Sequence, residues 1–125
     1  MFSHIVVGSN DLAKSKAFYD AVFTAMGGKP GADMGTRLAY NHKGANFMVS
    51  IPINGEPATY ANGGTIGFMM DSDEQLQAWH DAGVAAGGTS CEDPPGVRDL
   101  GFAKLNLAYL RDPDGNKLCA MRPAG

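Results

Sequence analysis

Residues 103–122 read AKLNLAYLRDPDGNKLCAMR, two runs rich in strand-forming side chains on either side of the polar segment Asp112 to Asn116. Proline fixes φ at one corner of such a segment, and glycine and asparagine tolerate positive φ at the positions that follow. The segment therefore predicts a tight turn that joins two strands, Ala103 to Arg111 and Lys117 to Arg122.

The N-terminal half begins with a strand followed by a helix. Phe2 to Gly8 is a short strand-like run, and the side-chain oxygens of Ser9-Asn10-Asp11 suit a helix start. Apolar residues then recur at helical spacing from Leu12 to Met26, and Gly27-Gly28 ends the pattern. Two further strands are expected at 36–41 and 45–53, separated by a turn at 42–44.

The same order of elements returns in the second half. Gly64 to Met70 is strand-like, Asp71-Ser72-Asp73 is a second capping cluster, and Leu76 to Ala86 is helical. Residues 65–68 align with residues 4–7 at an offset of 61, and the same offset sets 79–82 on 18–21. Aligning Gly115 with Gly44 places Leu118-Cys119 opposite Phe47-Met48. The chain therefore repeats one structural unit.

Each half therefore reads as a strand, a helix and then two or three strands. We expect an α+β fold in which two tandem βαβββ modules form curved mixed sheets around a cup, with the helices outside. We expect a single domain over residues 1–125, with halves at 1–53 and 63–125 and a connector at 54–62. A half of roughly sixty residues leaves an apolar sheet face uncovered. The halves are therefore expected to pack together or to exchange between two chains.

Composition excludes several classes of protein. A hydrophobic share of 44% with 18% charged residues indicates a globular chain. The net charge of −3 offers no basic stripe to a phosphate backbone, so we expect no nucleic-acid partner. No apolar run approaches the roughly 20 residues that cross a bilayer, and the first residues lack the basic leader and long apolar core typical of a signal peptide. We therefore expect no membrane partner, a cytoplasmic location, and reduced thiols at Cys91 and Cys119.

The repeated unit carries further marks: His4 in the first strand, Asn10-Asp11-Leu12 and Phe18-Tyr19 in the first helix, and the hexapeptide 111–116 before the last strand. On these residues the chain resembles the vicinal oxygen chelate superfamily, which includes glyoxalase I, extradiol dioxygenases, and fosfomycin and bleomycin resistance proteins. The resemblance covers essentially the whole chain. The hexapeptide is its most specific element, and its physical content is turn chemistry, which identifies a fold better than a function.

In metal-using members of that superfamily the ligands come from the first and last strands of each half. The resemblance places these positions at His4, Met48, Thr65 and Cys119. Only His4 is a usual ligand, which makes it a weak candidate in an incomplete metal site, since Mg²⁺, Mn²⁺ and Fe²⁺ favour carboxylate and imidazole. No cofactor is therefore expected. A divalent metal (Zn, Mn or Ni) remains the alternative, because soft sulfur ligands suit some of these ions.

Two candidate catalytic residues follow, each with a structural alternative. His4 is a ligand, a general base or a hydrogen-bond donor, or else a histidine satisfied near a strand end. Alternation sends Leu107, Tyr109 and Arg111 to one face of their strand. If that face lines the cup, Tyr109 is a donor or weak acid toward a ligand; otherwise it is a core tyrosine whose hydroxyl reaches the rim.

The remaining candidates are expected to line the ligand or to be structural. Cys119 is expected to be an inert buried thiol, because its sequence neighbours include no activating base. Arg98 lies in a polar loop at 91–102, where it either clamps an anionic ligand group or pairs with Asp99 or Glu92. His80 is expected half-exposed on a helix surface. His42 is expected in a solvated turn.

Three functions are compatible with these residues. The first is a glyoxalase/bleomycin-resistance-like protein that binds a small molecule without the usual metal chemistry, with Met48, Thr65, Arg98 and Cys119 around the ligand. The alternative is a metal-dependent glyoxalase-like lyase or isomerase acting through His4 and Tyr109. The third is a structural or interaction module, because sheet edges invite pairing. The resemblance implies a homodimer in each case, since relatives of this length commonly pair.

Overall fold

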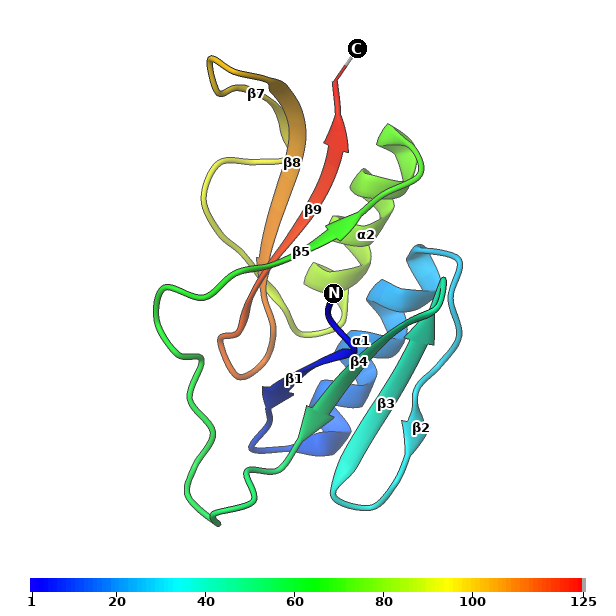
Figure 1. Cartoon of the computed structure of the whole chain (residues 1–125), viewed down its shortest axis with the longest axis vertical. Helices are drawn as coiled ribbons and strands as arrows, with labels where there is room; N and C mark the ends of the chain where they lie inside the picture. Colours follow the sequence, from blue (N-terminus) through cyan, green and yellow to red (C-terminus); the bar gives the residue numbers. More distant parts are fainter. Residues whose placement is uncertain (125) are drawn as a thin grey trace.

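Two modules with the same order of elements make up the chain, whose computed structural model describes residues 1–124. The first contains β1 (His4–Gly8), α1 (Leu12–Ala25), β2 (Ala32–Asp33), β3 (Arg37–His42) and β4 (Ala45–Ser50). The second contains β5 (Ile66–Met69), α2 (Asp73–Ala85), β6 (Thr89–Ser90), β7 (Gly96–Asp99), β8 (Lys104–Arg111) and β9 (Lys117–Pro123). Figure 1 shows the two sheets one above the other, with both helices behind them. The predicted α+β fold of two modules is confirmed.

The first strand of each module runs parallel to its last strand. The strand order is β1-β4-β3-β2 in the first sheet and β5-β9-β8-β6 in the second, where β7 also pairs with β8. The register sets Ile5 opposite Phe47 and Ile66 opposite Leu118. These pairs are related by the same offsets that align His4 with Thr65 and Gly44 with Gly115. The strand register therefore confirms the internal duplication.

Both helices begin at a side-chain cap. Asp11 accepts the Lys14 N–H at 3.2 Å, and Ser72 accepts the Gln75 N–H at 3.0 Å. The second helix starts at Asp73, three residues before the predicted start at Leu76. The prediction was late because it followed apolar spacing, whereas the cap at Ser72 and two acidic residues in the first turn stabilise the polar start. No helix within residues 1–124 is long and apolar enough to span a membrane.

Three strands were not located from the sequence, and one of them, β7, lies where a polar loop was predicted. The short strands β2 and β6 extend the sheets at their edges, and β7 lies within the segment 91–102. β7 pairs antiparallel with β8, from Gly96 opposite Leu107 to Asp99 opposite Lys104. The sequence did not predict this strand because the segment 91–102, with two prolines and two glycines, has a low β propensity. The strand forms because β8 supplies its hydrogen-bonding partner.

The core lies between the helices and the sheets. Phe18 of α1 and Trp79 of α2, which the 61-residue offset aligns, are both fully buried. The two helices lie against each other, and Gly83 and Gly88 give the space for this contact. A Cβ at Gly83 would lie 2.4 Å from the Leu110 Cδ1, and one at Gly88 would lie 2.4 Å from the Phe18 Cε1. Because glycine has no side chain, these two positions let α2 and the segment after it pack closely against the core.

The turn between β8 and β9 fastens the second module to the first. Tyr19 of α1 donates its hydroxyl to Asp112 Oδ2 at 2.5 Å. Asn116 Nδ2 donates to the same oxygen at 2.8 Å and to the Gly8 carbonyl at 3.1 Å. Asp112 Oδ1 accepts the backbone N–H groups of Asp114 and Asn116, both at 2.9 Å. The predicted tight turn is confirmed, and it also joins the modules.

A second carboxylate extends this contact to the start of α1. Asp114 Oδ1 accepts the Asn10 N–H at 2.9 Å, and its Oδ2 accepts the Ser15 hydroxyl at 3.3 Å. Burial raises the pKa of Asp112, although the hydrogen bonds from Tyr19 and Asn116 lower it. Burial and the neighbouring Asp112 hold the pKa of Tyr19 well above its ordinary value. Tyr19 therefore remains a hydroxyl donor at any physiological pH.

Replacing Tyr19 by phenylalanine is expected to lower the free energy of unfolding by about 1.5–3 kcal/mol, because Asp112 loses a buried donor. Urea denaturation monitored by circular dichroism measures the change. Tyr60→Phe is the matched control, because Tyr60 is exposed and its loss of a hydroxyl should change the free energy by less than about 0.5 kcal/mol. Equal effects of the two substitutions would show that the Tyr19 bond does not stabilise the module contact.

Gly88→Ala is expected to destabilise the chain by about 1–3 kcal/mol, because the new methyl group would overlap the Phe18 ring and approach the Gly83 carbonyl oxygen to 2.9 Å. Gly67→Ala is the control. Gly67 lies within β5, and a Cβ there meets no atom within 4 Å among the described residues. Thermal unfolding of both variants checks the difference, and a Gly88→Ala protein as stable as Gly67→Ala would contradict it.

Candidate functional site

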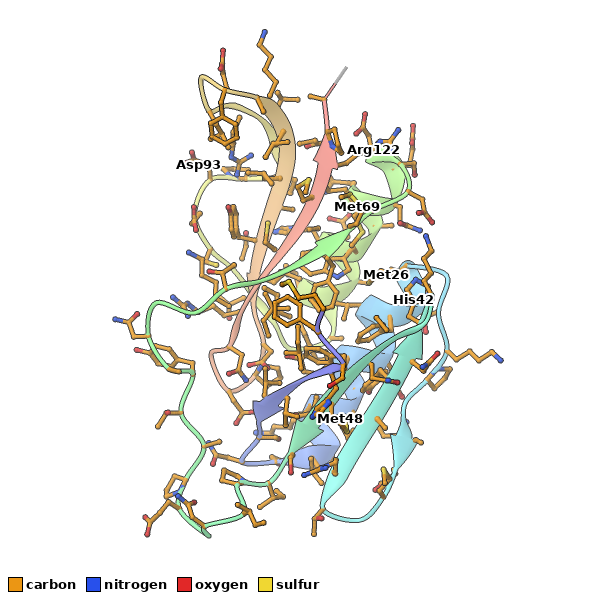
Figure 2. The ribbon with its side chains drawn as sticks, in the orientation of Figure 1. Met26, His42, Met48, Met69, Asp93 and Arg122 are labelled. Carbon is orange, nitrogen blue, oxygen red and sulfur yellow. The ribbon has the colours of Figure 1, made fainter. Side chains whose placement is uncertain are left out.

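Each sheet has one face covered by a helix and one that points away from it, which we call the open face. Alternation places buried residues such as Val7, Phe47 and Leu118 against the helices. The open face of the first sheet carries His4, Val6, Ala39 and Met48, and that of the second carries Gly67, Met69, Leu107, Tyr109, Cys119 and Met121. Figure 2 shows Met48 on β4 and Met69 on β5.

The four positions that the resemblance singled out occupy equivalent places. His4 begins β1 opposite Asn46, and Met48 lies on β4 opposite Val6. Thr65 immediately precedes β5, and Cys119 lies on β9 opposite Gly67. His4 and Thr65 are exposed, Met48 is half-buried and Cys119 is buried. The only side-chain partner of His4 is Ser3, whose Oγ lies 2.7 Å from its Nδ1, so its Nε2 is free of hydrogen bonds among the described residues.

Tyr109 on β8, Cys119 on β9 and Cys91 immediately after β6 form a row on the second open face. Tyr109 pairs with Cys119, and its carbonyl accepts the Cys91 N–H at 3.3 Å. Burial raises the pKa of both cysteine thiols and of the Tyr109 hydroxyl, and the neighbouring Cys119 raises that of Tyr109 further. Both cysteines are free of disulfide bonds. The row therefore presents protonated, hydrogen-bonding groups and not activated nucleophiles.

Arg98 does not pair with Asp99 or Glu92, contrary to the structural alternative expected from the sequence. Its Nη1 donates to the Gly96 carbonyl at 2.7 Å and to the Leu107 carbonyl at 3.2 Å, and its Nη2 donates to the Asp93 carbonyl at 2.8 Å. These bonds form because β7 folds back onto β8. Glu92 instead forms a salt bridge with Lys117 of β9.

Two hollows lie between the edges of β1 and β5. One, of about 270 Å³, is mainly apolar and has Phe23, Phe47 and Phe68 in its walls. The salt bridge between Lys43 and Asp71 lies beside it. The other, of about 280 Å³, includes Val6 and Thr65 in its lining, together with Tyr60 of the connector. The junction of the modules is therefore an indented region that continues into both open faces.

A sequence model of the Glyoxalase/Bleomycin resistance protein/Dioxygenase superfamily matches residues 1–120. The chain belongs to this superfamily. A glyoxalase/bleomycin resistance protein from Albidiferax ferrireducens T118 has 55% sequence identity and a TM-score of 0.93, over 97% of this chain and 98% of that one. No curated protein matches the chain significantly.

More distant structures share the fold of this superfamily member. A family enzyme from Burkholderia phytofirmans PsJN is 17% identical with a TM-score of 0.75, and covers 98% of both chains. A glyoxalase-related enzyme from Fulvimarina pelagi is 20% identical with a TM-score of 0.72, over 97% of this chain and 86% of that one. At such identities the likeness concerns the architecture alone.

The donor set of this glyoxalase-superfamily chain does not fit the metal that the family implies. His4, Met48, Thr65 and Cys119 supply one imidazole, two sulfur atoms and one hydroxyl, with no carboxylate. Residues 1–124 contain no group of three or more His, Cys, Asp or Glu side chains placed to hold a metal ion. Exchange of modules between two chains would not improve the set, because the first module always supplies His4 with Met48 and the second Thr65 with Cys119.

Two histidines lie elsewhere than expected. His80 is buried, not half-exposed, and its Nε2 lies 2.9 Å from the Ser90 Oγ. Burial lowers its pKa, so it is neutral at pH 7. It is buried because β6 closes over α2, which helical spacing alone does not reveal. His42 ends β3 instead of lying in a turn, and it lines the apolar hollow with its ring 6.4 Å from that of Phe23.

Met69 and Lys117 also belong to the open face, although neither was predicted from the sequence. Met69 is 58% exposed, and the Lys117 Nζ lies 5.1 Å from the centre of the Tyr109 ring. Alternation from Thr65 along β5 and from Cys119 along β9 would have found both, because each lies an even number of residues away.

Proposed function

We propose that this superfamily member binds a small organic molecule on its open face, without the usual metal chemistry. The observation that carries the proposal is the apolar character of that face. Val6 is 45% exposed there and Met69 is 58% exposed, with Met48 and Met121 half-buried beside them. A sheet face that meets only water normally carries polar side chains, and methionine adapts its shape to varied ligands.

A few polar groups accompany the apolar surface, as in most small-molecule sites. His4 presents an exposed imidazole, Thr65 a hydroxyl, and Tyr109 a phenol beside the Cys119 thiol. In the proposed role these groups orient the ligand by hydrogen bonds, while the methionines cover its apolar part. Arg98 borders this surface with its guanidinium fixed by three carbonyls.

We also propose that a second copy of the chain completes the cup. Within residues 1–124, β1 pairs only with β4 and β5 only with β9, and the hollows between these two edges leave the cup open within one chain. Phe102 is 85% exposed and Leu100 is 43% exposed at the turn between β7 and β8. Large exposed apolar side chains are a feature that chains cover by association.

Metal titration separates this proposal from the metal-dependent lyase or isomerase. The purified, chelator-treated protein is expected to take up no stoichiometric Zn²⁺, Mn²⁺ or Ni²⁺, because its donor set lacks a carboxylate. Elemental analysis after dialysis measures the content of wild type and His4→Ala. One ion per chain in the wild type, lost in His4→Ala, would overturn the proposal and favour an enzyme that uses His4 and Tyr109 with a metal.

A polar substitution on the open face is expected to weaken an apolar ligand. N-phenyl-1-naphthylamine is a neutral fluorescent probe, and Val6→Gln should raise its Kd about threefold to tenfold through lost apolar contact. Val84→Gln is the matched control, because Val84 of α2 is 46% exposed, almost as much as Val6. Fluorescence titration measures both constants. An unchanged Kd in Val6→Gln would place the probe elsewhere.

A further inference from the structure

Charged side chains of the strands are sorted between the two sheet faces. The strands contain two acidic residues, Asp33 and Asp99, and the register places both on the helix side, opposite Leu38 and Lys104. Most cationic strand residues lie on the open face instead: Arg37, Arg98, Arg111 and Lys117. The chain as a whole has a net charge of −3, so this local excess of positive charge opposes its overall balance.

The cations on the helix side have acidic neighbours, which those on the open face largely lack. Lys104 pairs with Asp99 across β7 and β8. Arg122 has its Nε 3.6 Å from the Asp73 carboxylate. On the open face of the second sheet, within residues 1–124, only Lys117 has such a partner, Glu92, which comes from the segment before β7.

Two guanidinium groups of the open face hydrogen-bond to backbone carbonyls alone in the described part of the chain. Arg98 donates to three carbonyls, as described above, which fix its plane but leave its charge uncompensated. Arg111 donates Nη1 to the Gly115 carbonyl at 2.7 Å and lies 5.2 Å from the centre of the Tyr60 ring. Both positive charges are therefore held in place before any ligand arrives, which lowers the entropic cost of binding an anion.

These cations flank the Tyr109 row. Arg111 pairs with Lys117 in the register one step below Tyr109 and Cys119. Arg98 reaches the Leu107 carbonyl, one step above. Burial raises the pKa of Cys119 and Glu92 raises it further, whereas the hydrogen bond with Tyr109 and the nearby Arg98 and Lys117 lower it. Both cations therefore lie close enough to act on the Cys119 thiol, as does Glu92. Tyr109 adds a phenol hydroxyl between them.

We propose that the ligand of the open face is an anionic small molecule, whose carboxylate, sulfonate or phosphate group lies beside Tyr109 between Arg98 and the Arg111–Lys117 pair. Its apolar part then covers Met69 and Met121, which lie on the same face. This inference rests on the proposed binding function and names the class of ligand for that site. A fixed guanidinium and a phenol donor match an oxyanion, because each supplies N–H or O–H groups in defined directions.

A matched pair of probes tests the charge. 8-Anilinonaphthalene-1-sulfonate and N-phenyl-1-naphthylamine share one ring system and differ by the sulfonate. Fluorescence titration at low ionic strength is expected to give the sulfonate at least about threefold tighter binding. Added NaCl should weaken the sulfonate and leave the neutral probe unchanged, since exposed charges are screened. This comparison needs no variant, so it holds even if a substitution perturbs folding.

Single substitutions show which cations bind the sulfonate group. Arg98→Gln and Lys117→Gln should each raise the Kd of the sulfonate probe about threefold to tenfold and leave that of the neutral probe unchanged. Lys104→Gln removes the same charge from the helix side, and should change neither constant. Cooperative thermal unfolding shows that each variant is folded.

The outcomes separate the two proposals. If neither probe binds, the proposed binding function fails. If both probes bind equally and without salt dependence, the function stands and the anionic ligand is overturned. A sulfonate preference that Lys104→Gln reduces as much as Arg98→Gln also overturns it, because the charge then acts from the whole surface. Equal probe affinities with a dimer that dissociates in salt, measured by sedimentation, would overturn it and assign the cations to the contact between chains.

Discussion

The hydrogen bond between Tyr19 and Asp112 is the constraint on which the arrangement of the two modules depends. The oxygens of a buried carboxylate need hydrogen-bond donors, and Asp112 accepts the Tyr19 hydroxyl of α1 and the backbone N–H groups of Asp114 and Asn116 within its own turn. The Asn116 side chain also donates to the Gly8 carbonyl at the end of β1. These hydrogen bonds attach the turn of the second module to β1 and α1 of the first module. With the turn fixed there, α2 lies against α1 and both sheets present their open faces on the same side (Figure 1).

The open faces follow from this arrangement. Because both helices pack behind the sheets, no helix among the described residues covers the open faces, although Leu107 and Cys119 are buried there by other segments. The open faces carry methionines, Val6, Tyr109 and most of the strand cations, whereas the acidic strand residues lie on the opposite side. Apolar contact and positive charge are thus combined on one surface, which is the combination that an amphiphilic anion requires.

Much of the fold could be predicted from the chain alone, because caps, turn residues and alternation act over a few positions. The two offsets that align the halves are the ones that the strand register confirms, and Ser72 and Asp11 mark both helix starts. Contacts between segments far apart in the sequence could not be predicted in the same way. β7 exists because β8 supplies its partner, His80 is buried because β6 closes over it, and Arg98 lies among carbonyls that a fold-back brings together.

The sequence by itself determined the repeated module and the turn at 112–116, since each depends on residue identity at fixed local spacing. The depleted ligand set came from the sequence together with its resemblance to the superfamily. Only the tertiary structure decided that this turn accepts a hydroxyl from a residue 93 positions away. It alone also decided which charges remain unpaired on the open face. Pairing of charges and burial of polar groups depend on which segments meet in space, and a strand pattern specifies faces without specifying what lies across from them.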